Sequence, residues 1–186
     1  GSIPGLVRHE GDIIIGTLAG LRTVKNLPRL VRAFATLPGS AKLVIVGEGP
    51  ERAAILAEAE RLGVAERVLM PGFLTKPHRY IGHFDIFALS SDSEQFPISL
   101  VEAMAAGLPV VSTDVGDVKA MVAPENADLV VPVHDEGSLG AALGALTRDG
   151  ALRQRLGATN RMRARAEYDE IAMISRYATL YGLPDP

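Results

Sequence analysis

Residues 91–114 read SDSEQFPISLVEAMAAGLPVVSTD, and this stretch decides how the middle of the chain folds. It opens with small polar residues, continues with apolar residues at helical spacing, and closes with a short apolar run. Pro97 suits the first turn of a helix because an N–H there would have no partner, and Gly107 suits the left-handed position that follows a helix. The pattern predicts a loop, a helix over residues 97–106 and a buried strand over residues 109–113.

Two carboxylates frame the predicted helix, Glu94 in the loop before it and Glu102 in its second turn. Glu102 is the only charged residue between Glu94 and Asp114. A charge on such an apolar helix is expected to have a partner or a ligand. Taken alone, the pair is compatible with two solvent-exposed side chains or with the two acids of a glycoside hydrolase. The start of a helix, however, presents free N–H groups and partial positive charge, which favours a ligand that is part phosphate and part polyol.

The composition argues against several classes of protein. The chain has 186 residues, of which 47% are apolar, and this indicates one globular domain. Its net charge of −3 gives no general affinity for nucleic acid. It contains no cysteine, and its four histidines lack metal-ligand spacing, so no metal site is predicted. No apolar run approaches the roughly 20 residues of a membrane span and no secretory signal is recognised, so we expect a cytoplasmic protein. The arginine-rich segment 148–165 is expected to be a solvated helix face.

Hydrophobic periodicity divides the chain into alternating strands and helices. Residues 1–11 are interpreted as a linker, and the folded domain is expected to cover residues 12–182. The predicted strands are residues 12–19, 41–46, 67–70, 85–89, 109–113 and 128–131. The predicted helices are residues 27–37, 51–62, 76–83, 97–106, 117–122, 135–147, 150–166 and 169–181. Nearly all-apolar strands that alternate with helices indicate the α/β class, here a doubly wound, Rossmann-like parallel sheet of about six strands with helices on both faces.

In such a sheet, ligands bind beyond the carboxyl ends of the strands. At these ends the sequence has Arg22 and Lys25 after the first strand, a Gly47–Pro50 turn after the second, and Gly72 and Phe73 after the third. The two cations suit a diphosphate, and Phe73 suits a base or sugar. The alternatives are that the cations are simply solvent-exposed, that Phe73 belongs to the core, and that the glycines only turn the chain. Neither the dinucleotide fingerprint G-x-G-x-x-G nor a Walker A loop follows the first strand.

Nearly the whole chain, about residues 12–182, resembles a known family. Glu94 and Glu102 are the two ends of an E-x7-E motif. Further matching segments are EAMAAGLPVVSTDVGDV at 102–118, KNLPRLVRAF at 25–34, LVIVGEGP at 43–50, RVLMPGF at 67–73 and DIFALSSDSE at 85–94. These motifs are similar to those of retaining glycosyltransferases of the family 4 type, which have the GT-B fold. The resemblance implies the C-terminal, nucleotide-sugar-binding half of such an enzyme, without its N-terminal acceptor-binding half.

The resemblance also implies roles for individual residues. Glu102 would accept hydrogen bonds from the ribose hydroxyls, Glu94 would be the catalytic residue at the donor sugar, and Lys25 would bind the diphosphate. The backbone N–H groups of residues 98–100 would meet the phosphates, and the loop of residues 71–74 would meet the base. The implied donor site consists of Gly20, Arg22, Lys25, Gly47, Gly72, Phe73, Glu94, Gln95, Phe96, Pro97, Ile98, Ser99, Leu100 and Glu102.

The implied reaction moves a hexose from a UDP- or GDP-sugar to an acceptor, and it requires no metal or other cofactor. The implied partners are the nucleotide-sugar donor and the N-terminal half, through which peripheral membrane contact is possible; no nucleic acid is implied. Two alternatives stay open, a sugar-nucleotide epimerase of related fold and a non-catalytic domain that binds a nucleotide sugar. By itself the chain is expected to bind a nucleotide without transferring a sugar.

The sequence departs from the family pattern at two places. Gly20 stands where the family usually has an arginine on the diphosphate, and Arg22 is a candidate substitute because it lies two residues further on. Glu94 is followed by Gln-Phe-Pro where the family usually has Gly-Phe-Gly. Pro97 removes one backbone donor and Gln95 adds a side chain near the sugar, so the contacts to the sugar are expected to differ from those of the family.

Overall fold

The protein is described by a computed structural model, which covers residues 1–170. Six parallel strands form one sheet in the order β3-β2-β1-β4-β5-β6. The strands are β1 (Ile13–Leu18), β2 (Ala41–Val46), β3 (Val68–Gly72), β4 (Ile86–Leu89), β5 (Val110–Thr113) and β6 (Val130–Val131). The predicted fold class, a doubly wound Rossmann-like sheet of about six strands, is confirmed. The helix predicted over residues 169–181 lies almost entirely outside the described residues.

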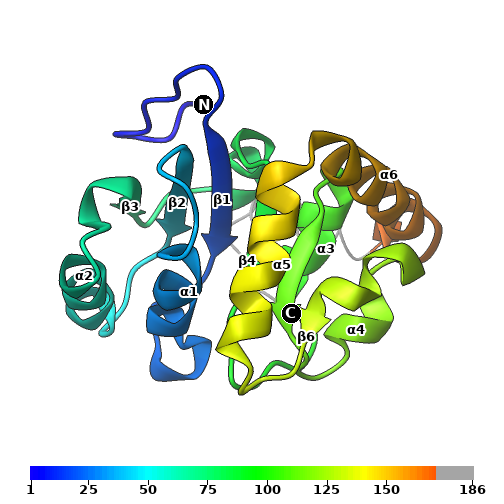
Figure 1. The fold of residues 1–186 in the computed structure, drawn as a ribbon. Helices are drawn as coiled ribbons and strands as arrows, with labels where there is room; N and C mark the ends of the chain where they lie inside the picture. Colours follow the sequence, from blue (N-terminus) through cyan, green and yellow to red (C-terminus); the bar gives the residue numbers. More distant parts are fainter. Residues whose placement is uncertain (171–186) are drawn as a thin grey trace.

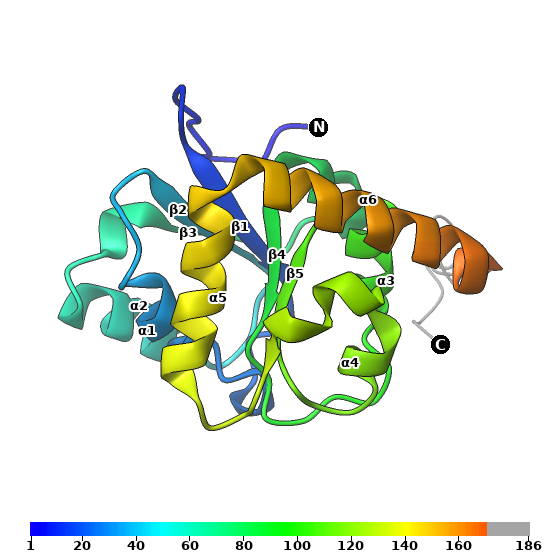
Figure 2. The same cartoon turned by 45° about the vertical axis from the view of Figure 1, so that its right-hand side comes forward.

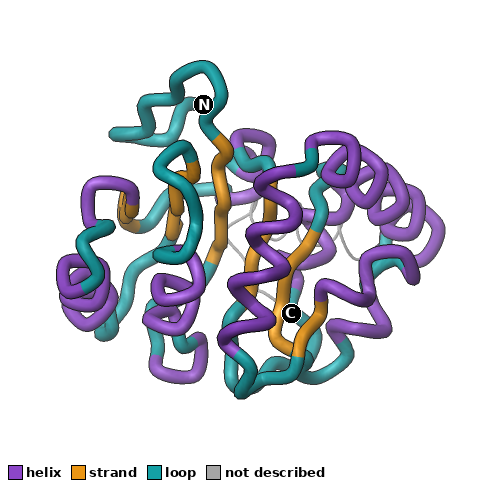
Figure 3. The backbone as a smooth tube through the Cα atoms, in the orientation of Figure 1, coloured by secondary structure: helices purple, strands orange, loops and turns teal. Residues whose placement is uncertain are grey.

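Helices cover both faces of the sheet (Figures 1 and 2). One face carries α1 (Leu27–Phe34), α2 (Arg52–Arg61) and α5 (Glu136–Arg148), and the other carries α3 (Ile98–Ala105) and α4 (Val118–Met121). The last described helix, α6 (Gly150–Glu167), packs against both α5 and α3. Figure 3 shows the strands enclosed between these helices, with loops gathered at the two ends of the sheet.

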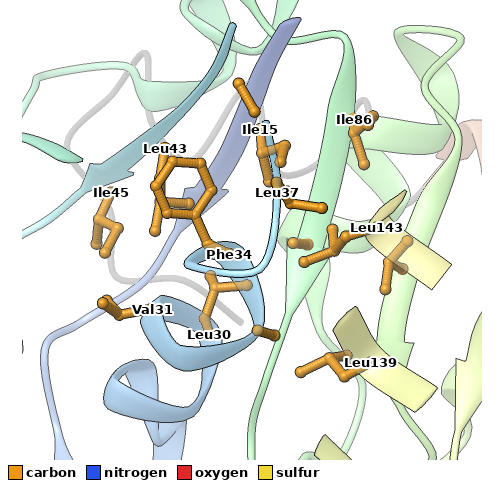
Figure 4. Close-up of a cluster of buried hydrophobic side chains, with 14 of the residues drawn as sticks. Ile15, Leu30, Val31, Phe34, Leu37, Leu43, Ile45, Ile86, Leu139 and Leu143 are labelled. Atoms are coloured by element: carbon orange, nitrogen blue, oxygen red, sulfur yellow. The ribbon is translucent and has the colours of Figure 1, made fainter. Parts of the chain in front are cut away.

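The strands alternate between two hydrophobic cores because successive side chains of a strand point to opposite faces. In β1, Ile15 joins the core under α1, α2 and α5, whereas Ile14 joins the core under α3 and α4. Figure 4 shows the first of these cores, in which the ring of Phe34 from α1 packs beside Leu43 of β2. Phe34 is fully buried, and burying a side chain of this size contributes about 1.5–3 kcal/mol. The two cores hold the loops at the strand ends in place.

Local sequence signals mark the start of α1 and the end of α3. Asn26 adopts a left-handed conformation and its side-chain oxygen accepts a hydrogen bond from the Arg29 N–H, as an N-cap does. At the end of α3, the N–H of Gly107 donates to Met104 and that of Leu108 donates to Ala103, and Gly107 has φ +80°. This is a Schellman motif, for which glycine is favoured because its φ is positive. The predicted role of Gly107 is confirmed.

Some predicted element bounds were wrong by one or more residues. Pro97 is the N-cap of α3 and not its first helical residue, because its ψ of 109° is extended. The short helix predicted over residues 76–83 is two 3-10 turns, η3 (Pro77–Arg79) and η4 (Ile81–His83). β6 has two residues where four were predicted. Short elements are the most affected, since neighbouring contacts decide where their hydrogen bonds end.

The segment before β1 lies against the amino-terminal edge of the sheet. Ile3 is only 3% exposed and belongs to the core under α3 and α4. Arg8 forms an ion pair of 2.8 Å with Asp85, and Lys42 donates to the carbonyl oxygen of Val7. These contacts leave the opposite, carboxyl-terminal edge of the sheet clear of the N-terminus, which lies at the top in Figure 1 while β1 points downward.

Candidate donor-binding site

The strand order creates a switch point between β1 and β4. The chain builds β2 and β3 on one side of β1, and then returns to build β4, β5 and β6 on its other side. The loops that leave the carboxyl ends of β1 and β4 therefore turn to opposite faces of the sheet, and ligands of doubly wound proteins bind at such a point. Lys25 is in the loop after β1, and Glu94 is in the loop after β4.

Lys25 and Glu94 meet across this switch point. The Lys25 ammonium nitrogen lies 2.5 Å from the Oε1 atom of Glu94, and the two side chains are 19% and 9% exposed. The Ser91 hydroxyl donates to the same carboxylate oxygen at 2.7 Å. A lysine ammonium has three donors, so Lys25 can bind Glu94 and still offer protons to an anion. The two side chains predicted to serve the diphosphate and the sugar are thus in direct contact.

Buried hydroxyls fix the backbone around these two charges. The Ser90 hydroxyl donates to the carbonyl oxygen of Lys25 at 3.0 Å, and the Thr113 hydroxyl, at the end of β5, donates to the carbonyl oxygen of Ser91 at 2.7 Å. Ser90, Ser91 and Thr113 are all about 1% exposed. We did not single out these three residues from the sequence. Their signal was small polar residues at the ends of otherwise apolar strands.

The start of α3 points a helix N-terminus into the same region. No side chain caps this helix, and its N-cap is Pro97. Of the three backbone N–H groups implied to meet phosphates, that of Leu100 donates to the carbonyl oxygen of Pro97 at 3.1 Å. The Leu100 side chain is fully buried in the core. The N–H groups of Ile98 and Ser99 are therefore the ones available for an anion at this helix start.

Arg22 lies beside Gly20, where the family resemblance placed an arginine. A Cβ atom built on Gly20 would lie 3.6 Å from the Nε atom of Arg22. The Arg22 side chain therefore folds back over Gly20 and occupies the space that a side chain at position 20 would enter. Arg22 is exposed, so its guanidinium is accessible from solvent at the carboxyl edge of β1.

Gly47 and Gly72 bring the loops after β1, β2 and β3 together. The Gly47 N–H donates to the carbonyl oxygen of Gly72 at 3.0 Å. Gly47 has φ +145°, and a Cβ atom on it would overlap the carbonyl oxygen of Ala19. Gly47 is therefore needed for the close packing of these loops, whatever it contributes to a ligand. Beyond Gly72, Phe73 is 72% exposed, which leaves its ring open to an aromatic or sugar partner.

Residues 94–97 lie between the switch point and the end of α6. Gln95 is exposed, whereas Phe96 makes an edge-to-face contact with Tyr168, with ring centroids 5.9 Å apart. Sequence reasoning did not find Tyr168, which follows α6 and has no motif of its own. Glu102 is half-buried in the second turn of α3, on the helix whose start faces the site.

Neither metal-binding clusters nor membrane spans are found in the part of the chain that the structure describes. Within residues 1–170, no group of three or more His, Cys, Asp or Glu side chains is placed to hold a metal ion. None of the helices in these residues is both long and apolar enough to cross a membrane. Lys25, Arg22 and the start of α3 supply positive charge near the switch point.

The sequence profile of the family described as "Glycosyl transferases group 1" matches residues 3–163. The chain belongs to this family. The predicted resemblance is thereby confirmed at the level of the family. This glycosyl transferase domain is 32% identical over 173 residues to the N-acetylgalactosamine-N,N'-diacetylbacillosaminyl-diphospho-undecaprenol 4-alpha-N-acetylgalactosaminyltransferase of Campylobacter jejuni, covering 92% of the chain and 47% of that protein.

Other relatives of the glycosyl transferase domain are also longer than it is. It is 34% identical over 167 residues to the D-inositol 3-phosphate glycosyltransferase of Xylanimonas cellulosilytica, covering 85% of the chain and 40% of that protein. The N-acetyl-alpha-D-glucosaminyl L-malate synthase of Bacillus anthracis is 29% identical over 174 residues, with 92% and 46% covered. The chain thus spans less than half the length of these curated relatives.

Solved structures share the fold of this domain. The Anabaena protein Alr3699/HepE, in complex with UDP, superposes with a TM-score of 0.81 at 22% identity, covering 93% of this chain and 50% of that one. The sucrose-phosphate synthase of Thermosynechococcus elongatus has a TM-score of 0.78 at 27% identity, covering 92% and 46%. The architecture is therefore that of one Rossmann-like half of a GT-B glycosyltransferase.

Proposed function

We propose that this domain holds the nucleotide-sugar donor of a retaining glycosyltransferase, which moves a hexose from a UDP- or GDP-sugar to an acceptor. The observation that carries the proposal is the contact between Lys25 and Glu94 across the switch point of the sheet. It brings a cation suited to a diphosphate and an acceptor suited to sugar hydroxyls into one place, at the edge where doubly wound sheets bind ligands.

In this proposal the diphosphate lies between Lys25 and the start of α3, where the N–H groups of Ile98 and Ser99 and the helix dipole favour negative charge. Arg22 contributes a second cation and takes the place of the family arginine. As the bond between the sugar and the diphosphate breaks, negative charge grows on the departing phosphate. These donors stabilise that charge without rearranging, which lowers the barrier.

The two glutamates bind the polyol parts of the donor in this proposal. Glu94 holds the hydroxyls of the sugar and faces the carbon at which the bond breaks, and Glu102 holds the ribose. Gln95 and Pro97 shape the sugar pocket at the two positions where the family usually has glycine, while Phe73 and the loop around Gly72 meet the base. An exposed ring such as Phe73 gains by stacking on a base because the contact removes apolar surface from water.

The most direct test is a screen of nucleotide binding. We expect the protein to bind at least one of UDP, GDP and ADP, or their sugars, with a dissociation constant in the high-micromolar to millimolar range. Replacing Lys25 by alanine should weaken that binding by about ten- to a hundredfold, since a charge-assisted hydrogen bond contributes roughly 1.5–3 kcal/mol. Calorimetry or a thermal-shift titration measures both.

Lys42→Ala is the matched control. Lys42 also loses an ion pair, of 2.6 Å with Asp12, but at the amino-terminal edge of the sheet. The control should bind nucleotides like the parent protein. Absence of nucleotide binding at millimolar concentrations, or equal binding by the parent and Lys25→Ala, would overturn the proposed function.

The proposed transfer also needs a partner domain. We propose that the acceptor is held by a second, N-terminal Rossmann-like half, in agreement with the greater length of the relatives. Holding donor and acceptor in line makes the reaction effectively unimolecular, and a chain with the donor half alone lacks that advantage. Residues 1–186 should therefore bind a nucleotide sugar without transferring the sugar. The measurement is the release of nucleoside diphosphate in the presence of an acceptor. Sustained transfer of the sugar to any acceptor by this chain alone would contradict the proposed need for a second half.

A further inference from the structure

A buried arginine lies behind the proposed site. Arg29, in the first turn of α1, is 6% exposed. Its Nη1 atom lies 2.8 Å from the Oδ1 atom of Asp92 and donates to the carbonyl oxygen of Ser90 at 3.0 Å. A guanidinium is rarely buried unless it is paired, so Asp92 is the partner that makes this position tolerable. Neither residue belongs to the set that the family resemblance assigned to the donor.

Asp92 makes all its described contacts with one segment of the chain. Its N–H donates to the carbonyl oxygen of Val24 at 2.8 Å, and its carboxylate accepts a hydrogen bond of 3.3 Å from the side chain of Asn26. Together with Arg29, these residues belong to the segment 24–29, which includes Lys25. The loop after β4 is therefore tied to the loop after β1 by side-chain and backbone contacts on both sides of Lys25.

We propose that Arg29 and Asp92 are a positioning pair that sets the distance between Lys25 and Glu94 before a donor arrives; the proposal rests on the function proposed above. Asp92 lies two residues before Glu94, and Val24 and Asn26 are the immediate neighbours of Lys25. A shift of Asp92 relative to the segment 24–29 therefore moves Glu94 relative to Lys25. Holding the two groups in a binding-ready geometry avoids an ordering cost when the diphosphate enters.

A positioning role and a purely stabilising role predict different effects on ligand affinity when the Arg29–Asp92 pair is lost. Loss of the pair would lower stability in either case, because Arg29 would keep a buried charge without its carboxylate. If the pair positions Lys25, however, its loss must weaken the binding of a diphosphate more than that of a monophosphate. The positioning role assigns Lys25 to the second phosphate, which a nucleoside monophosphate lacks. The ratio of the two affinities is thus the informative quantity.

The test uses Asp92→Ala in the full chain, with the nucleoside diphosphate that the parent binds among UDP, GDP and ADP, and with the monophosphate of the same nucleoside. We expect the dissociation constant of the diphosphate to rise about tenfold, because a misplaced Lys25 loses much of a charge-assisted hydrogen bond that contributes roughly 1.5–3 kcal/mol. The dissociation constant of the monophosphate should change by less than about twofold. Calorimetric titration provides both values.

Asp12→Ala is the matched control for the loss of an aspartate that is paired with a cation. Asp12 forms an ion pair of 2.6 Å with Lys42 and accepts a hydrogen bond from the His9 N–H, but it lies at the opposite end of β1. This variant should lose stability while keeping the parent's ratio of diphosphate to monophosphate affinity. An unchanged ratio in Asp92→Ala as well would overturn the positioning role.

A double variant tests whether Asp92 acts through Lys25. In Lys25→Ala/Asp92→Ala, diphosphate binding should be no weaker than in Lys25→Ala alone, because the group being positioned is already gone. Additive losses would overturn the proposal and assign Asp92 an effect of its own.

Hydrogen exchange of the unliganded protein separates this inference from the proposed function. In Asp92→Ala, the amides of residues 24–26 and 90–94 should exchange faster than in the parent, and in Asp12→Ala they should not. Unchanged exchange overturns the pairing of the two loops even if nucleotides bind. A parent that binds none of the nucleotides overturns the proposed function and, with it, the role of the pair in binding.

Discussion

At the scale of single residues, the candidate site is organised before any ligand is present. Glu94 already accepts hydrogen bonds from Lys25 and Ser91 through one carboxylate oxygen. Such prior bonds mean that a donor does not have to order these side chains when it binds. The Arg22 side chain, in contrast, is exposed and folds over Gly20.

Arg22 gives a prediction at this scale. If its guanidinium replaces the family arginine, Arg22→Ala should weaken the binding of a nucleoside diphosphate by about tenfold or more and that of the nucleoside only slightly, because the lost contact is a charge-assisted one to phosphate. Gly20→Arg in the Arg22→Ala background should recover part of the lost affinity. Titration of the nucleoside and the diphosphate into each variant measures the effect.

Two results would contradict this assignment. One is a diphosphate affinity in Arg22→Ala equal to that of the parent, which would leave Lys25 as the cation of the site. The other is an equal loss of nucleoside and diphosphate binding, which would indicate a general disturbance of the loop. Arg52→Ala serves as the control, because Arg52 binds Glu48 and the carbonyl oxygen of Met70 on the β2 and β3 side of the sheet.

At the scale of elements, the loop between β5 and α4 supports the loop that carries Glu94. Gly116 lies in this β5–α4 loop with φ +50°, and a Cβ atom on it would lie 2.3 Å from the carbonyl oxygen of Glu94 and 2.9 Å from that of Gln95. Only a residue without a side chain lets the two backbones approach so closely. The conformation of the Glu94 loop therefore depends on an element that does not itself carry a proposed ligand contact.

Gly116→Ala should disturb the site through this contact. The obstructing atoms are backbone carbonyls, which cannot swing aside, so the Glu94 loop must move. We expect nucleotide affinity to fall about tenfold, because the misplaced Glu94 loop weakens charge-assisted hydrogen bonds to the ligand, and we expect a loss of roughly 1–3 kcal/mol in stability from strain. Denaturant unfolding and calorimetric titration measure the two effects.

Gly63→Ala is the matched control for the strain alone. Gly63 also has a positive φ, +70°, but no atom lies within 4 Å of a Cβ built on it, and it follows α2, away from Glu94. It should lose about 1 kcal/mol of stability without a change in nucleotide affinity. If both alanine variants bind nucleotide equally well, the β5–α4 loop has no influence on the site.

At the scale of the whole molecule, charge clusters tie the helices of one face together. Arg32 of α1 donates to both carboxylate oxygens of Glu136 in α5 and also pairs with Glu58 of α2 at 3.5 Å. The hydrogen bond from Arg32 lowers the pKa of Glu136 below its ordinary value of 4.5, and the hydrogen bond from Arg61 lowers the pKa of Glu58. Three helices thus share one partly exposed network.

The lowered pKa of Glu136 gives a pH-dependent prediction. A carboxyl group whose pKa is lower in the folded state stabilises the fold fully above its ordinary pKa, and this contribution is lost as the pH falls through the folded value. Glu136→Gln should therefore lower the melting temperature near pH 7 by about 1–3 °C, a small effect because the pair is partly exposed. The difference from the parent should shrink progressively below about pH 4.5.

Melting curves of both proteins between pH 3 and pH 7 provide the measurement, with Glu125→Gln, at an exposed position, as control. A difference that stays constant over this range would show that Glu136 acts through packing and not through its charge.

The sequence by itself determined the six strands, most of the described helices, and their order along the chain. The bounds of β2 were predicted to the residue, and the cap at Asn26 and the Schellman glycine at Gly107 were also found from local signals. These features depend on residues a few positions apart, so a hydrophobic period or a single cap residue suffices to indicate them. The E-x7-E spacing was likewise visible in one stretch.

The tertiary structure decided which of these residues meet. Lys25 and Glu94 are 69 positions apart, and they touch because β4 pairs with β1 and not with β3. Neither the hydrophobic periodicity nor a local motif indicates that strand order, because it follows from how the helices pack on both faces of the sheet. The sequence likewise shows Arg29 as an ordinary charged residue on a helix, and only the tertiary structure buries it against Asp92. The close approach of Gly116 to the backbone of the Glu94 loop is also a tertiary contact.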